Sequence, residues 1–157
     1  MSEPWIHVAI RVHARLCARD AVAEVLRSVC RLAERDGRER ELEWRVVTAF
    51  NEAFNNVVNY AYAPGQHGDV CIDVTVDAAR LVLELRDDGY GFDFEARSRA
   101  PLPELDALDA GGMGLFLIRN AMSSVSYERG APNRLRMIRE FETDADVRDP
   151  NDEAPQC

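Results

Sequence analysis

Two neighbouring stretches with a two-residue period restrict the fold of this chain more than any other feature. Residues 69–77 read DVCIDVTVD and residues 80–87 read RLVLELRD, with an apolar side chain at every second position. Successive side chains of a β-strand point to opposite faces, so each stretch is predicted to be a strand with one buried face. The short connector at 77–79 would join them as antiparallel neighbours. The sequence therefore predicts a hairpin whose apolar face needs a second layer to cover it.

Amphipathic helices are predicted to form that layer. A first helix covers the stretch 18–37 and ends at Gly37, because glycine commonly terminates helices. A second helix is predicted from about Glu39 to Tyr62, before Pro64. The apolar positions of the first helix, which should face the core, are Val22, Val25, Leu26, Val29, Leu32 and Ala33.

The remaining segments complete the fold prediction. They are a half-buried strand at 5–12, a short helix opening at the glycine-rich stretch 111–114, and a closing hairpin formed by 124–130 and 134–142. Together these elements predict an α/β two-layer sandwich, with helices on one face of a mixed, mostly antiparallel sheet. The polar stretch 93–110 has no period; its length of about 18 residues suggests a lid or binding loop.

The composition fits one domain. A chain of 157 residues with 46% hydrophobic content is large enough for one core and too short for two. Six acidic residues and one arginine fall within 142–157, where large apolar residues are almost absent, as is typical of a disordered terminus. We therefore expect a folded domain at 1–142 and an acidic tail at 143–157.

Charge and cysteine usage exclude several classes of protein. A net charge of −9 argues against a nucleic-acid-binding surface, and all 19 basic residues are arginine, which excludes lysine chemistry. There is no secretory signal pattern, and no apolar stretch approaches the ~18 residues of a membrane span. A reduced, cytoplasmic protein without membrane association is expected. Neither the cysteines nor the histidines form a metal-binding cluster: Cys17, Cys30, Cys71, Cys157, His7, His13 and His67.

The second helix contains AFNEAFNNVVNYAYAPG (49–65), which is unusually rich in asparagine. Asparagine is a poor helix former, so its repeated use needs an offsetting reason. At helical spacing Glu52, Asn56 and Tyr60 form one strip, and a carboxylate one turn from an amide can hold a hard cation beside a base. The alternative is an ordinary solvated helix face. The apolar positions expected on the other side are Val46, Phe50, Ala53, Phe54 and Val57.

Two further stretches are predicted to bind a ligand. In LELRDDGYGFDF (83–94), Asp87 ends a strand and could accept hydrogen bonds from an exocyclic amine, with Gly89 and Gly91 allowing close backbone approach; the alternative is an Asp-capped turn. In AGGMGLFLIRNAM (110–122), glycines precede a helix whose free N–H groups could bind phosphate. This stretch matches neither a Walker A loop nor the dinucleotide fingerprint, and the alternative is a flexible loop that enters a core helix.

The order and spacing of NEAFNNVVNYAY, RDDGYGF and GGMGLFLIRNAM resemble the N, G1 and G2 boxes of the GHKL ATPases, which share the Bergerat ATP-binding fold. More narrowly, Glu-Ala-x-x-Asn ending in Ala-Tyr, and a G2 box running into Leu-Phe-Leu-Ile-Arg, resemble the bacterial anti-sigma serine/threonine kinases of partner-switching systems. The resemblance extends over residues 6–142.

This resemblance implies that the chain binds ATP and Mg²⁺. Glu52 would act as the general base toward a substrate serine, Asn56 would coordinate Mg²⁺, and Asp87 would receive the adenine amino group. Gly112 and Gly114 would line the phosphates, with Gly111 as the lid hinge. The full cofactor-binding set implied is Asn56, Asp87, Gly89, Gly91, Phe92, Gly111, Gly112, Met113, Gly114 and Leu115.

The chain departs from the family at Tyr60, where a histidine is common. Asn55 and Asn59 are not motif positions and are interpreted as polar surface or lid contacts. Arg97 and Arg99 in the loop could meet the γ-phosphate, with solvated loop charge as the alternative.

By the family's logic, the chain is an ATP-dependent protein serine/threonine kinase and a switch protein. It would phosphorylate a STAS-domain anti-sigma-factor antagonist and, acting as a homodimer, sequester a sigma factor or another effector. The alternative is a non-catalytic, nucleotide-gated binding protein that sequesters its partner without phosphotransfer. The intact pair of Glu52 and Asn56 argues against this alternative.

Overall fold

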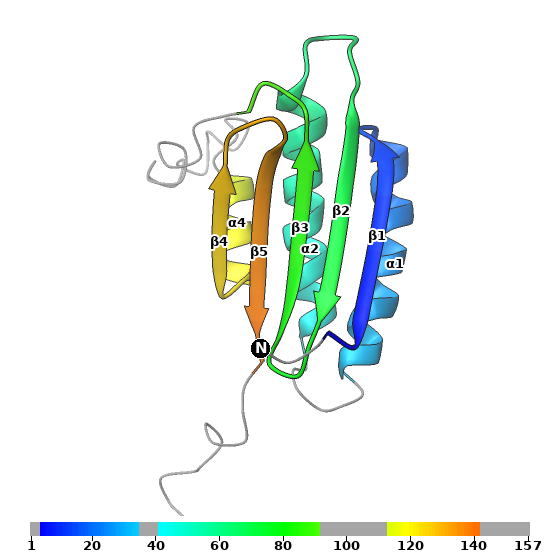
Figure 1. The fold of residues 1–157 in the computed structure, drawn as a ribbon, viewed down its shortest axis with the longest axis vertical. Coiled ribbons are helices and arrows are strands. Elements are labelled where there is room, and N and C mark those ends of the chain that lie inside the picture. Colours follow the sequence, from blue (N-terminus) through cyan, green and yellow to red (C-terminus); the bar gives the residue numbers. More distant parts are fainter. Residues whose placement is uncertain (1–3, 35–40, 92–112, 142–157) are drawn as a thin grey trace, which may run out of the picture.

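One sheet and one layer of helices make up the computed structural model, which describes residues 4–34, 41–91 and 113–141 (Figure 1). The sheet has five strands in the order β1-β2-β3-β5-β4. The helices lie on one of its faces, so the predicted two-layer sandwich is confirmed. The elements are β1 (Ile6–His13), α1 (Leu16–Glu34), α2 (Leu42–Asn56), η1 (Val57–Ala61), β2 (Asp69–Val76), β3 (Arg80–Asp87), α4 (Met113–Ala121), β4 (Ser124–Glu128) and β5 (Asn133–Glu140).

The strands pair as their alternation predicts. β2 and β3 form the expected antiparallel hairpin, with Val76 opposite Leu81 and Val70 opposite Asp87. β4 and β5 form the closing hairpin, and β5 also pairs with β3. Every pairing among the described strands is antiparallel, which is the simplest case of the mostly antiparallel sheet that was predicted.

The core lies between the sheet and the helices. The apolar residues that alternate along β2 and β3 on the face covered by the helices are at most 2% exposed. Helix α1 buries a narrower apolar face than its sequence predicts. Val25 and Leu32 are 38% and 48% exposed. At about 100° per residue these two side chains lie some 60–80° from Val22, beyond the edge of the buried arc. The prediction that they face the core is therefore wrong.

Helix α2 also departs from its prediction at the C-terminal end. The expected core positions Val46, Phe50, Ala53 and Phe54 are buried, at most 1% exposed, and Val57 is half-buried. The α-helix ends at Asn56, however, and continues as the π-helical turn η1. Because the pitch changes at Val57, the regular four-residue spacing does not extend from Asn56 to Tyr60, which is 47% exposed.

The other face of the sheet is polar. His7 and His13 of β1 each contact an aspartate of β2, Asp73 at 3.4 Å and Asp69 at 2.6 Å. His7 lies within the predicted strand at 5–12, and β1 extends one residue further to include His13. Within the described ranges no three histidine, cysteine, aspartate or glutamate residues are grouped to hold a metal ion. Among the described residues, this face is therefore lined by cross-strand polar contacts.

Several predictions concern residues outside the described ranges: the helix end at Gly37, the loop at 93–110 and the tail at 143–157. None of the described helices combines the length and apolarity that crossing a bilayer requires. Cys30 is fully buried in the core, and this burial raises the pKa of its thiol to about 12. A thiol with such a pKa stays protonated and unreactive at neutral pH.

Candidate functional site

The three motifs found in the sequence meet at one end of the sandwich. The N-terminus of α4 packs against α2 at Gly114, where a Cβ would lie 2.8 Å from Glu52 Oε2 and 3.8 Å from Asn56 Nδ2. Asn56 also lines a small pocket together with Asp87 and Gly91. A carboxylate, an amide, a helix N-terminus and a strand-end carboxylate, which are distant in sequence, are thus neighbours in the fold.

Glu52 and Asn56 lie beneath the first turn of α4. Both are half-buried, and the missing side chain at Gly114 leaves the space that Glu52 occupies. The first N–H groups of an α-helix have no partner within the helix and carry a partial positive charge. An anionic group placed there would lie within reach of a carboxylate and an amide oxygen, which is a suitable arrangement for a phosphate with a divalent cation.

Asp87 is held in one orientation by the protein. It is 9% exposed, and its Oδ1 accepts the backbone N–H of Gly89 at 2.9 Å and the Nδ2 of Asn133 at 3.1 Å. The described residues give Oδ2 no hydrogen bond, so this oxygen can accept one from a ligand. Burial, followed by the negative charge of Asp87, raises the pKa of nearby Tyr62, whose hydroxyl donates to Asp69 O at 3.3 Å.

The pocket beside Asp87 is mostly apolar. A flat ring could lie between the apolar walls and present an amine to Asp87. The described walls leave only about 20 Å³ between them, so they would have to separate to admit a purine. The lining residues are Ala53, Asn56, Val57, Ala61, Leu85, Asp87, Gly91, Tyr127 and Leu135.

Asn133 is a site residue that sequence reasoning missed. It is 1% exposed; its Nδ2 donates to Asp87 Oδ1 and to Gly89 O at 2.9 Å, and its Oδ1 accepts the N–H of Gly130. In the sequence it follows Ala-Pro and reads as a turn residue. Only the pairing of β3 with β5, which sets Asp87 opposite Asn133, reveals it. No local signal could have identified this role.

The two glycines after Asp87 have their space filled by the protein itself. A Cβ on Gly89 would lie 2.3 Å from Ala61 O, and Gly91 has a φ of +68° with Asn133 Oδ1 only 2.7 Å from its ideal Cβ position. These glycines therefore permit close packing of the turn at 87–91 against its neighbours. The contact of Gly89 and Gly91 with a nucleotide stays a prediction.

The remaining predicted site residues are divided between the core, the surface and the undescribed segments. Met113 is half-buried at the start of α4, whereas the side chain of Leu115 is in the core, 3% exposed. Asn55 is half-buried and accepts a hydrogen bond from Arg19 at 2.9 Å, so this polar contact joins α2 to α1. Asn59 is exposed, as expected. Outside the described ranges are Phe92, Arg97, Arg99, Gly111 and Gly112.

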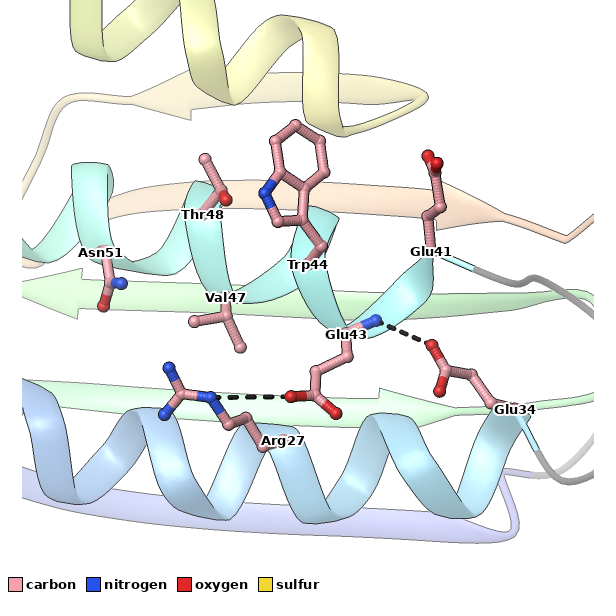
Figure 2. Close-up of a pocket in the computed structure, with 8 residues that line it drawn as sticks. All are labelled: Arg27, Glu34, Glu41, Glu43, Trp44, Val47, Thr48 and Asn51. Carbon is pink, nitrogen blue, oxygen red and sulfur yellow. Dashed lines mark hydrogen bonds and ion pairs between the residues drawn. The ribbon is translucent and has the colours of Figure 1, made fainter.

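A larger groove of about 850 Å³ runs along α1 and α2 (Figure 2). Its charged groups are used to join the two helices: Glu34 Oε1 accepts the Glu43 N–H at 3.0 Å, and Arg27 Nε lies 3.6 Å from Glu43. Glu34 thereby satisfies a free N–H in the first turn of α2. Because these groups already have partners, the groove is a weaker candidate for a catalytic site than the smaller pocket beside Asp87.

This combination of fold and site defines a class of protein. The chain belongs to the family of histidine kinase-like ATPase domains, whose model matches residues 17–139. The resemblance to GHKL ATPases inferred from the three motifs is therefore confirmed.

Curated relatives narrow the class. The chain is 30% identical over 99 residues to the serine/threonine-protein kinase BtrW of Bordetella bronchiseptica, covering 62% of this chain and 70% of that protein. It is 34% identical over 82 residues to the serine-protein kinase RsbW of Bacillus subtilis, covering 49% of this chain and 51% of that protein. It is 28% identical over 110 residues to RsbW of Listeria monocytogenes, covering 66% and 70%. The narrower resemblance, to the partner-switching serine kinases, agrees with these matches.

Proposed function

We propose that this chain is an ATP-dependent protein serine/threonine kinase that phosphorylates a STAS-domain anti-sigma-factor antagonist. The observation that carries the proposal is the packing of Gly114 on Glu52 and Asn56, which sets a helix N-terminus over a carboxylate and an amide. Phosphoryl transfer depends mainly on positioning and charge neutralisation, and these groups can supply both. The kinase names of the relatives support the same reaction class.

The residues present fit ATP and Mg²⁺. Within the described ranges nothing bonds to Asp87 Oδ2, so this oxygen can accept an amine hydrogen bond, and the first turn of α4 offers N–H groups to phosphate. Bound Mg²⁺ would neutralise phosphate charge, and in such sites one or two protein ligands act together with phosphate oxygens. Asn56 would be that protein ligand, which agrees with the lack of any metal-binding group of three acidic, histidine or cysteine side chains among the described residues.

Glu52 would accept the proton of the attacking hydroxyl. Its carboxylate is half-buried beside Gly114, so one oxygen can face the phosphates while the other faces an incoming side chain. A general base needs to lie within hydrogen-bond reach of the hydroxyl that it deprotonates. Because position 114 has no side chain, the Glu52 carboxylate can lie against the first turn of α4, where the hydroxyl and the phosphates would meet.

The regulatory part of the proposal is partner switching. The chain, acting as a homodimer, would sequester a sigma factor or another effector, and would exchange it against the unphosphorylated antagonist. This part is supported by similarity to the RsbW and BtrW kinases.

The testing experiment is transfer of labelled phosphate from Mg·ATP to a STAS-domain protein of the same organism. Wild type is compared with Glu52→Gln and with Glu43→Gln, a matched control on the same helix whose carboxylate contacts Arg27 and Arg31. Labelled serine or threonine with wild type and Glu43→Gln, but not with Glu52→Gln, is the expected result. Tight ATP binding without transfer to any such protein would favour the non-catalytic, nucleotide-gated binding protein instead.

A further inference from the structure

Helix α2 changes its pitch directly after Asn56. The next five residues, Val57–Ala61, form the π-helical turn η1, and at the junction the Val57 N–H points toward both Ala53 O and Phe54 O. A π turn contains an extra residue relative to an α-helix, is rare, and occurs mostly as a single turn at functional sites. We therefore expect a tertiary contact that favours the π turn over a regular α-helix.

That contact lies at the last residue of the turn. The Ala61 carbonyl accepts the backbone N–H of Tyr90 at 2.8 Å, and Ala61 is 8% exposed. A Cβ on Gly89 would lie 2.3 Å from this carbonyl oxygen and 2.6 Å from Ala61 Cβ. The π turn and the turn at 87–91 are thus packed backbone against backbone, and larger residues would separate them.

The turn at 87–91 is also held from the opposite side. Arg129 Nη2 donates to Tyr90 O at 2.9 Å, so both the N–H and the carbonyl of Tyr90 are bonded while its ring is 65% exposed. The strand-end turn that carries Asp87 is consequently fixed to the end of α2 through its main chain.

We propose that the π turn is a positioning element that sets the distance between the Glu52/Asn56 pair and Asp87, acting through the Ala61 carbonyl. Removing one residue from the turn would rotate that carbonyl by about 100°, away from the Tyr90 N–H. This proposal rests on the proposed function. Mg·ATP would contact both the Glu52/Asn56 pair and Asp87, so its binding should weaken when the distance between them changes. Adenosine would contact only the Asp87 side, where Val57 and Ala61 line the pocket, so its binding should be affected less.

The test removes a single residue. Deletion of the exposed Asn59 shortens the π turn, and deletion of the exposed His67 shortens the same connection outside it, as a matched control. Binding of Mg·ATP and of adenosine is measured by calorimetry. The Asn59 deletion should weaken Mg·ATP binding at least about tenfold, because small misplacements in such sites have large effects. It should weaken adenosine binding by a clearly smaller factor, since only the Asp87 side of the site is then probed. The His67 deletion should change neither.

If the affinities for Mg·ATP and adenosine fall by the same factor, or if neither falls, the proposal is overturned. Gly89→Ala is the second variant; it forces the same two backbones apart without changing the chain length. Because the Gly89 N–H also holds Asp87, both ligands should bind more weakly, with the larger factor for Mg·ATP. If the deletion variant does not fold, Gly89→Ala decides the outcome.

The proposed function and the positioning role can fail separately. If wild type binds no Mg·ATP, the proposed function is wrong, and hydrogen exchange at the Tyr90 amide then decides the positioning role. Protection of this amide in wild type and in the His67 deletion, but not in the Asn59 deletion, supports the proposal. Equal protection in both deletions overturns it.

Discussion

The two ends of the candidate site are built differently. At the Asp87 end, the carboxylate is buried, one of its oxygens is held by Gly89 and Asn133, and the turn backbone is bonded on both sides. At the Glu52 end, Glu52 and Asn56 are half-buried, and none of the described residues hydrogen-bonds to their side chains. A fixed acceptor is suited to recognition, whereas a carboxylate without fixed partners can take up a proton during a reaction. Under the proposed function, recognition would therefore take place at the Asp87 end and chemistry at the Glu52 end.

The largest effect is expected at the Glu52 end. Glu52→Gln keeps the shape of the side chain but removes the proton acceptor, so phosphate transfer should fall about 100- to 10,000-fold. The affinity for Mg·ATP should stay close to that of wild type because the Asp87 end is intact. Single-turnover transfer and equilibrium binding on the same sample check this. A parallel fall of affinity and transfer would break the division between the two ends.

A smaller effect is expected at the Asp87 end. Asp87→Asn can keep an acceptor facing Asn133, but it places an amide donor where a ligand amine would meet Oδ2. ATP affinity should fall about tenfold to a hundredfold, as expected when a buried polar contact is left unmatched. The matched control is Asp88→Asn, at the exposed neighbouring position. Equal ATP affinities of the two variants would show that Asp87 makes no specific hydrogen bond to the ligand.

The rigidity of the Asp87 end can be measured without a ligand. Asn133→Ala leaves Gly89 O and Gly130 N without their partner and should lower the free energy of unfolding by about 1–3 kcal/mol. Asn120→Ala, which removes an exposed amide bonded to Phe116 O, should change it by less than about 0.5 kcal/mol. Urea unfolding of both variants checks the difference. Similar values for the two would contradict the view that the Asp87 end is a buried, tightly bonded network.

The smallest effect should come from removing Mg²⁺. Chelation should weaken ATP binding by roughly 1 kcal/mol, or about fivefold, because the charge interactions of a half-exposed site are largely screened by water. Adenosine binding should not change, since the Asp87 end would need no metal. Titration of both ligands with and without chelator checks this prediction. Loss of adenosine binding on chelation would show that the metal acts at the Asp87 end, which would contradict the proposed division between the two ends.

The fold could be predicted well from the sequence because its signals are local. The alternation at 69–77 and 80–87 specifies strands with one apolar face, and the structure buries those residues against α2. Predictions were wrong where an element's environment decides the outcome. Val25 and Leu32 have the spacing of core residues, but the core covers a narrower arc of α1 than the periodicity implies.

The candidate site could be predicted only in part. Glu52, Asn56 and Asp87 were predicted as site residues because the order and spacing of three motifs resemble the GHKL boxes, and the structure brings these motifs together. Asn133 was missed because its role requires β5 to lie beside β3, and nothing near it in the sequence specifies that neighbour. The π turn was missed because the four-residue spacing of Glu52, Asn56 and Tyr60 fits a continuous α-helix; the hydrogen bond from Tyr90 to Ala61 exists only after the two segments have packed.

The sequence by itself determined the strands, the helices and the residues able to carry the chemistry, because periodicity and side-chain type act over a few neighbouring residues. Only the tertiary structure decided which strand lies beside Asp87, where α2 changes its pitch, and that Gly114 rests on Glu52. These features join segments that are far apart in the chain. The balance of packing and hydrogen bonding that selects them exists only when the whole sandwich is assembled.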